Sequence, residues 1–396
     1  MRGAFARRRA VIYLDNNSTT RPDPRVVEAM RAALLEGYGN PSSLHSIGMA
    51  AAEQLERARG SVARLLGARD PDRITFTSGG SESINVALRT ALALHPARSR
   101  VAAPGVEHSA VLATLEQACA SGERELVHLA VDRSGAPNWN ADFGWLDEQV
   151  ALVSVQWVNN ESGVITPPEA LRELARRCDA CGARLHVDAV QAAGKLALDV
   201  DALGASFVSV SAHKLHGPKG VGALWSRADV EPLPLVRGGP QERGRRAGTE
   251  NVAGIVGFGV ASELAGAWLA SGGPAELRRM RDDFERALVG GAGARAHGAA
   301  TARVANTSYL CFEGVQAESL QMLLDAEGIA VSTGAACSSE MRAPSHVLLA
   351  MGCSAEEATS SIRFSLSRET RPEELTRALE IVSRSLADLR ALAGPR

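Results

Sequence analysis

The run Phe207-Val208-Ser209-Val210-Ser211-Ala212-His213-Lys214 is short and apolar at its start and ends in polar groups, and a glycine-rich turn, residues 217–220, follows it directly. This pattern predicts a buried β-strand with a lysine just past its carboxyl end. A charged, unpaired lysine in that place is costly, so its amine is driven toward the neutral form. A neutral amine is the state that forms a Schiff base, which makes Lys214 a candidate catalytic residue.

Strand-like and helix-like segments alternate through the first two thirds of the chain. Strands are predicted at 74–77, 100–103, 150–158, 184–187 and 207–210, and helices at 25–35, 50–66, 82–94 and 110–120. Strands that alternate with helices require crossover connections. The sequence therefore predicts an α/β fold with a mostly parallel sheet, of the seven-stranded type, covered by helices on both faces.

The pattern changes after about residue 252. Helices at 253–271 and 275–289, a loop at 290–300 and short strands at 307–312, 330–332 and 361–365 predict a smaller α+β domain. We expect an N-terminal segment, 1–24, that contributes to the small domain, a large domain at 25–262 and a small C-terminal domain at 263–396. The apolar run 251–269 contains Glu263, which favours a buried helix over a membrane span.

Charges nearly balance over the 396 residues, with 43 Lys and Arg against 45 Asp and Glu. This balance leaves no broad basic surface, so we expect neither a nucleic-acid nor a membrane partner. The arginine-rich stretch 242–246 is too short to change that expectation.

The six cysteines have no framework spacing, and the apolar run near the N-terminus is too short for a signal peptide. Both features indicate a reducing compartment and a cytoplasmic location.

Lysine is rare in this chain and occurs only at positions 195, 214 and 219. Arginine cannot replace it as a nucleophile, because the guanidinium stays protonated. Lys219 falls in the turn after the strand, where a solvated role is expected, and Lys195 falls in an amphipathic connection after Gly194. Lys214 is the remaining candidate.

Two further segments point to the same chemistry as Lys214. The stretch Thr77-Ser78-Gly79-Gly80-Ser81-Glu82-Ser83 lies between a strand and a helix, where free N–H groups and hydroxyls form an anion cradle or, alternatively, an ordinary helix cap. Asp188 ends an apolar strand. Its carboxylate either faces a ligand at the carboxyl end of the sheet or caps the next helix. A lysine, a carboxylate and a phosphate cradle are what pyridoxal phosphate requires. His108 could stack on its ring or shuttle protons, although a lone histidine is more often structural.

The remaining candidates concern sulfur and a carboxylate. Cys337 lies in a run of small residues, 332–339, which indicates an accessible loop that could carry a reactive thiol, whereas most free cysteines are small buried hydrophobes. Arg363 lies in a predicted strand, where its fork suits a substrate carboxylate. Cys178 and Cys181 have no second pair at ligand spacing, so we favour incidental helix-end cysteines and expect no resident metal.

From about residue 12 to 386 the chain resembles the cysteine desulfurases of the pyridoxal-phosphate aminotransferase fold. The resemblance rests on the phosphate and cysteine loops above and on these motifs: YLDNNSTT at 13–20, GNPSS at 39–43, EH at 107–108, VNNE at 158–161, HVDAVQ at 186–191, SAHK at 211–214, RAGT at 246–249 and SIRFS at 361–365.

The resemblance implies a homodimer in which Lys214 binds pyridoxal phosphate covalently, Cys337 becomes a persulfide and His108 stacks on the cofactor ring. L-cysteine is the implied substrate. The residues implied to hold the phosphate are Gly80, Ser81, Ser211 and His213, with Thr249 supplied by the other subunit. Asp188 is implied to pair with the ring nitrogen, Gln191 with the ring hydroxyl, and Asn160 and Arg363 with the substrate carboxylate.

The resemblance also suggests a sulfur acceptor. The short cysteine loop matches the branch that passes sulfur to iron-sulfur scaffold proteins, with Cys337 as a transient cluster ligand. The segments 213–216 and 241–251 are most similar to the nitrogen-fixation type. Selenocysteine lyase or cysteine sulfinate desulfinase activity, and sulfur donation for tRNA thiolation, are alternatives. A cofactor-free sulfur or metal-binding scaffold that uses Cys178, Cys181 and Cys337 is the non-enzymatic alternative.

Overall fold

The computed structural model describes residues 11–137, 143–334 and 343–393, and within them seven strands form the large sheet. Their order is β2 (Ile74–Thr77), β8 (Gly222–Ser226), β7 (Phe207–Ser211), β6 (Arg184–Asp188), β5 (Val150–Gln156), β3 (Arg100–Pro104) and β4 (Glu125–Leu129). Strand β8 alone runs in the direction opposite to the other six strands of this sheet. The predicted mostly parallel α/β sheet is confirmed.

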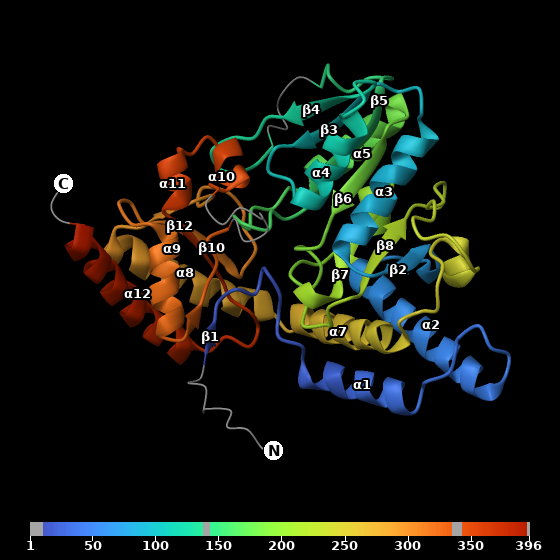
Figure 1. Cartoon of the computed structure of the whole chain (residues 1–396), viewed down its shortest axis with the longest axis horizontal. Coiled ribbons are helices and arrows are strands. Elements are labelled where there is room, and N and C mark those ends of the chain that lie inside the picture. The colour runs from blue at the N-terminus through green and yellow to red at the C-terminus, as the bar shows by residue number, and fades with distance from the viewer. Residues whose placement is uncertain (1–10, 138–142, 335–342, 394–396) are drawn as a thin grey trace.

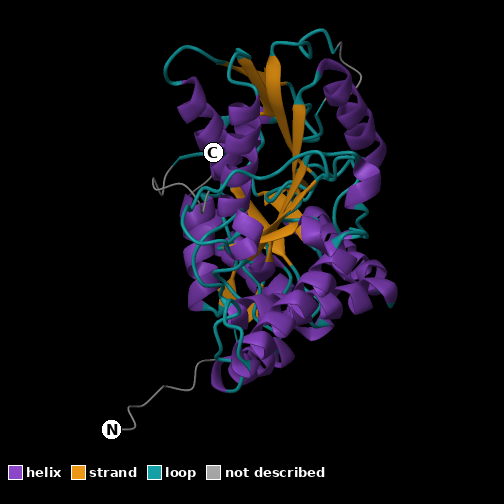
Figure 2. Ribbon diagram, turned by 90° about the vertical axis from the view of Figure 1, so that its right-hand side faces the viewer, coloured by secondary structure: helices purple, strands orange, loops and turns teal. Residues whose placement is uncertain are grey.

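Helices cover both faces of this sheet because its strands are apolar on both sides (Figure 2). Phe207 points to the face that α3 (Gly80–Leu94) and α4 (Ser109–Cys119) cover, whereas Val208 and Val210 join the core on the opposite face. The helices that supply this second core are α2 (Ser46–Leu66), α5 (Pro168–Cys181) and α7 (Val252–Ala270). Alternation of buried residues between two cores is the signature of a parallel sheet inside a three-layer domain. Shorter elements complete this part: α1 (Pro24–Leu35), η1 (Pro71–Arg73), α6 (Val200–Leu203), η2 (Ala212–Lys214) and η3 (Gln241–Gly244).

A second, smaller α+β unit lies beside the large sheet and is drawn in orange and red in Figure 1. Its antiparallel sheet has the order β12 (Ser361–Ser365), β10 (Thr307–Cys311) and β9 (Arg295–Ala296). The N-terminal strand β1 (Ile12–Tyr13) pairs in parallel with β11 (Ile329–Ala330). The helices are α8 (Gly273–Ala292), α9 (Ala317–Ala326), α10 (His346–Ala350), α11 (Ala355–Thr359) and α12 (Pro372–Ala393).

The segment 290–300 was expected to be a loop, and this prediction is wrong in part. Helix α8 continues to Ala292 and ends at Gly293, whose φ of 65° is the left-handed conformation that glycine adopts readily. Strand β9 follows, and its partners Leu310 and Cys311 come from β10. Tertiary pairing therefore makes a strand of a stretch whose own residues favour a loop.

Helix α7 is the one helix in the described ranges whose length and composition would allow it to cross a membrane. It packs along α1 and α2 instead, as Figure 1 shows, and also contacts α8. Its charged residue, Glu263, accepts a hydrogen bond from Ser61 Oγ at 2.7 Å and pairs with Arg64 at 3.3 Å. The helix is thus packed against the protein along one side, with about half of its apolar stretch buried and Glu263 on its exposed side.

Candidate active site

A cavity of about 500 Å³ lies where the carboxyl ends of the large-sheet strands face the small sheet. It is lined by ten of the predicted site residues, Gly80, Ser81, His108, Asn160, Asp188, Gln191, Ser211, His213, Lys214 and Arg363. Thr249 is exposed in the segment between η3 and α7 and does not line this cavity. Cys337 lies outside the described residues. Ligands of open α/β sheets bind at this edge, so the cavity is the candidate active site.

Lys214 ends η2, directly after strand β7, and its amine is held by the N-terminal segment. Its Nζ donates to Asn17 O at 2.6 Å and to Ser18 O at 2.8 Å. The backbone of this segment is itself attached to η2, because Thr20 N–H donates to His213 O at 2.9 Å. The amine therefore lies in the cavity with its position fixed by two carbonyl groups.

Asp188 ends strand β6 and places a buried carboxyl group in the same cavity. Burial raises its pKa to about 6, against the opposing effects of a hydrogen bond from Val190 N–H, at 2.9 Å, and of the Lys214 cation. A turn follows β6 where a helix was the alternative, so Asp188 caps no helix. A carboxyl group with a raised pKa gains free energy from a nearby cation.

The residues predicted to form an anion cradle lie together at the start of α3 and the end of β7. The N-cap of α3, Gly79, provides no side-chain cap, and Gly80 and Ser81 line the cavity. Ser211 Oγ is buried and has no hydrogen-bond partner among the described residues. A Cβ added at Gly80 would lie 2.8 Å from Val190 Cγ2, so glycine keeps this wall open. An orphaned hydroxyl beside uncapped helix N–H groups fits a phosphate.

Two histidines in the cavity are neutral at physiological pH. Burial, with smaller contributions from the Lys214 cation and His346, lowers the pKa of His108 to about 4. His108 Nδ1 accepts a hydrogen bond from Ala110 N–H at 3.0 Å, so the neutral ring carries its proton on Nε2. Burial, with Lys214 and Lys219, also lowers the pKa of His213 to about 4.

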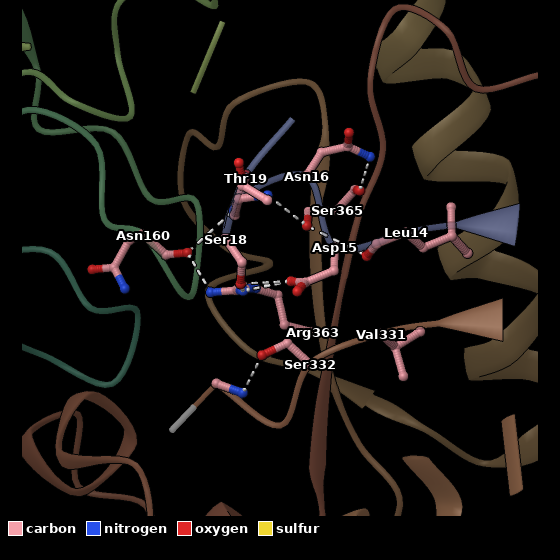
Figure 3. A network of polar contacts seen from close by, with 12 residues as sticks. Leu14, Asp15, Asn16, Ser18, Thr19, Asn160, Val331, Ser332, Arg363 and Ser365 are labelled. Carbon is pink, nitrogen blue, oxygen red and sulfur yellow. Dashed lines mark hydrogen bonds and ion pairs between the residues drawn. The ribbon is translucent and has the colours of Figure 1, made fainter. Parts of the chain in front are cut away.

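Arg363 reaches the cavity from β12 of the small sheet and is 3% exposed. Figure 3 shows its guanidinium surrounded by acceptors: Nη1 donates to Asn160 O at 3.0 Å, and Nη2 donates to Asp15 Oδ1 at 2.8 Å and to Ser18 Oγ at 2.7 Å. Its Nε has no hydrogen-bond partner in the part of the chain that the structure describes. The partner expected for this cation is thus supplied in part by the chain's own carboxylate, Asp15.

Sequence reasoning assigned no role in this site to Asp15, Asn17 or Lys195. Asn17 lines the cavity, and its side-chain amide donates to Asn160 O at 3.1 Å and to Thr307 Oγ1 at 2.9 Å. Lys195, which was assigned to an amphipathic connection, donates to Asn17 Oδ1 at 3.0 Å. The four-residue spacing between Gln191 and Lys195 is the signal that could have linked Lys195 to the site.

Two motifs remain outside the site. Cys178 is buried and Cys181 partly buried in the last turn of α5, where Cys181 Sγ lies 3.4 Å from Cys178 O, as expected for helix-end cysteines. The arginines of the stretch 242–246 are ion-paired: Arg243 with Asp72 at 2.6 Å, Arg245 with Glu231 at 2.5 Å and Arg246 with Glu82 at 3.1 Å. Paired arginines of this kind do not form a basic patch.

The chain was compared with known protein families, and residues 12–378 match the class-V aminotransferase family. A cysteine desulfurase from Cereibacter sphaeroides is 46% identical over 387 residues, which cover 96% of this chain and 97% of that protein. The chain belongs to the class-V aminotransferases, among the cysteine desulfurases. The cysteine desulfurase NifS of Azotobacter vinelandii is 43% identical over 383 residues, 96% of this chain and 94% of that one.

The fold agrees with that assignment. A solved structure described as a NifS-like protein superposes with a TM-score of 0.88 at 36% sequence identity, and the match covers 96% of this desulfurase and all of that chain (100%). The resemblance deduced from short motifs is therefore confirmed over nearly the whole chain.

Proposed function

We propose that this protein is a pyridoxal-phosphate-dependent enzyme that converts L-cysteine to L-alanine and leaves the sulfur on Cys337 as a persulfide. The observation that carries the proposal is the single cavity that joins the Lys214 amine, the Asp188 carboxyl group and the orphaned Ser211 hydroxyl, with Arg363 on the opposite wall. The names of the relatives support the choice of substrate.

The residues fit the cofactor. Gly80, Ser81, Ser211 and His213 would hold its phosphate, Asp188 its ring nitrogen and Gln191 its ring oxygen, while His108 would pack on the ring. When bound to Lys214, pyridoxal phosphate supplies an electron sink that stabilises negative charge at the substrate Cα.

The chain's own groups perform the remaining steps. Arg363 and Asn160 would hold the substrate carboxylate, because a guanidinium fork suits a planar anion. The Lys214 amine removes the Cα proton once it is neutral. The Cys337 thiolate attacks the substrate sulfur, so that the carbon–sulfur bond breaks as a sulfur–sulfur bond forms. Cβ takes up a proton, the protonated Lys214 amine returns a proton to Cα, and the products are alanine and the Cys337 persulfide.

The setting of the reaction is part of the same proposal. The exposed position of Thr249 supports a homodimer in which this residue completes the neighbouring phosphate site. The five described cysteines form no disulfide, which supports a reducing, cytoplasmic location. The similarity to NifS supports an iron-sulfur scaffold as sulfur acceptor, with a role in nitrogenase maturation.

Absorbance and product analysis test this function. The protein loaded with pyridoxal phosphate is expected to absorb in the visible range and to form alanine from L-cysteine. After borohydride reduction and digestion, the pyridoxyl label should lie on the peptide that contains Lys214. Lys214→Ala should lose both the absorbance and the activity, whereas Cys337→Ala should keep the absorbance and form no alanine from cysteine.

Substrate comparison separates the alternative activities. Turnover of L-cysteine, L-selenocysteine and L-cysteine sulfinate by the wild type and by Cys337→Ala is measured side by side. If Cys337→Ala loses turnover of L-cysteine but keeps turnover of the other two substrates, the result supports the desulfurase. Full cysteine turnover by Cys337→Ala, or a label on another peptide, overturns the mechanism.

A further inference from the structure

Lys195 lies behind the cavity wall and joins two side chains of the site. Its Nζ donates to Gln191 Oε1 and, at 3.0 Å, to Asn17 Oδ1. Gly194 makes this position possible: its φ of 75° turns the chain, and a Cβ there would lie 2.9 Å from Leu215 Cβ. The turn returns Lys195 to the same side of the chain as Gln191, four residues earlier.

These bonds fix which way the Gln191 amide faces. Gln191 Nε2 donates to the Asn17 carbonyl at 2.8 Å, and a carbonyl can only accept. The Lys195 amine donates to the other end, Oε1. Both partners therefore select one orientation, in which a second N–H of Nε2 is available in the cavity that Gln191 lines. That N–H suits an oxygen on the bound ring.

The same amine acts on Asn17, which contacts both walls of the site. Asn17 Oδ1 accepts from Lys195 and from Asn306 Nδ2, at 3.0 Å each. The opposite end of the amide donates to Asn160 O, the carbonyl that also accepts from Arg363. The backbone carbonyl of Asn17 accepts from Lys214. One amine thus contributes to the orientation of groups on the cofactor side and on the substrate side.

We propose that Lys195 is a positioning residue that orients Gln191 toward the cofactor ring and Asn17 toward Lys214 and Asn160. This inference rests on the proposed function, because Gln191 can be oriented toward a cofactor ring only if pyridoxal phosphate binds. Lys195 itself does not line the cavity.

The charges around Lys195 agree with this role. Burial lowers the pKa of Lys195, and the Lys214 and Arg363 cations lower it further. The Gln191 and Asn17 amides face it, and the charged or titratable groups near it are Lys214, Arg363, His216 and Arg368. An amine keeps N–H donors in either protonation state, so both hydrogen bonds persist when it is neutral.

Cofactor binding and a spectroscopic pH titration test the proposal, with Lys195→Met as the main variant. Methionine has a similar length but no N–H donor. We expect the affinity for pyridoxal phosphate to fall about tenfold, as loss of a buried hydrogen bond implies. The pKa of the lysine-bound cofactor, read from its visible absorbance, should rise, because Gln191 would no longer be held to donate to the ring oxygen, and loss of that donor favours the protonated form. Lys219→Met, the same change at an exposed lysine, should leave both quantities at the wild-type values.

A double variant separates positioning from general destabilisation. If Lys195 acts through Gln191, Lys195→Met should weaken cofactor binding by less than about twofold in a Gln191→Leu background, because interacting residues are not additive. Lys195→Gln keeps an N–H donor but has no amine. Its affinity for pyridoxal phosphate should lie between that of the wild type and that of Lys195→Met. An undiminished effect in the Gln191→Leu background, or wild-type behaviour of Lys195→Met, overturns the inference. Wild-type protein that binds no pyridoxal phosphate overturns the proposed function instead.

Discussion

The two walls of the cavity differ in how their carboxyl groups are paired. On the large-sheet wall, Asp188 accepts one side-chain hydrogen bond among the described residues, from Val190 N–H, and burial raises its pKa to about 6. On the small-sheet wall, Asp15 forms an ion pair with Arg363 at 2.8 Å. A buried carboxyl group without a counter-ion is costly to the folded chain, whereas a paired one is not. Under the proposed function, the cation of a bound ligand would complete the first wall, whereas the second already holds an ion pair.

The largest effect on activity is expected for substitution of Asp188, on the large-sheet wall. Asp188→Asn removes the negative charge but keeps an acceptor for Val190. Because the ring nitrogen would then lose the partner that keeps it protonated, we expect kcat to fall by on the order of 10³-fold, comparable to the loss of a strong electrostatic group in other active sites. Steady-state alanine formation measures it. A fall of less than tenfold would show that the charge of Asp188 is not required.

The arginine on the other wall should affect the substrate and not the cofactor. Arg363→Gln removes the fork, and we expect KM for L-cysteine to rise on the order of 10²-fold, the cost of losing a buried charge pair. Affinity for pyridoxal phosphate should be unchanged. Arg363→Lys, which keeps the charge without the fork, should lie between the two. Loss of cofactor affinity in Arg363→Gln would contradict this division of labour between the walls.

Asp188 should make the cofactor-free protein less stable at neutral pH. The folded chain holds this proton up to about pH 6, whereas an unfolded aspartate releases it near its ordinary value of 3.8. Between these pH values the folded state binds more protons, so the contribution of Asp188 to stability falls as pH rises. We expect cofactor-free Asp188→Asn to be more stable than wild type by about 3 kcal/mol at pH 7, and the difference to fall below about 1 kcal/mol near pH 4.

Chemical denaturation of both proteins at several pH values measures this difference. Taking the difference between variant and wild type removes the contribution of the buried histidines, whose lowered pKa values act in the opposite direction. Ser211→Ala, a change in the same cavity without a titrating group, should show no such pH dependence. An equal offset at pH 4 and pH 7 would contradict the raised pKa of Asp188.

The groups that sequence could predict are those whose role follows from neighbours in the chain. Lys214 and Asp188 each follow an apolar strand, and parallel strands bring their carboxyl ends to one edge. The motif between β2 and α3 likewise forms its cradle locally. Strand β8 was not predicted, because its sequence, Gly-Ala-Leu-Trp-Ser, is short and becomes a strand through antiparallel pairing with β2 and β7.

The contacts that sequence could not predict join distant segments. Lys195 and Asn17 are 178 positions apart, and Arg363 and Asp15 are 348 positions apart. A pattern can show that Arg363 needs an acidic partner, but the pairing of β1 with β11 and of β10 with β12 decides which carboxylate reaches it. On the small-sheet wall, sequence patterns therefore pointed to Arg363, whereas the structure was needed to show that Asp15 is its ion-pair partner.

The smallest effect is expected at Asp15, and its sign tests the comparison between the walls. Asp15→Asn keeps an acceptor for Arg363 Nη2 but removes the negative charge that competes with a substrate carboxylate. If Asp15 only neutralises Arg363 while no substrate is bound, KM for L-cysteine should fall, by about threefold for a pair with a partly exposed carboxylate that is worth under about 1 kcal/mol. Ser18→Ala, which removes a neutral partner of the same nitrogen, should not lower KM. If KM rises in Asp15→Asn as in Arg363→Gln, Asp15 holds the arginine in place, and the small-sheet wall depends on its ion pair to bind substrate at all.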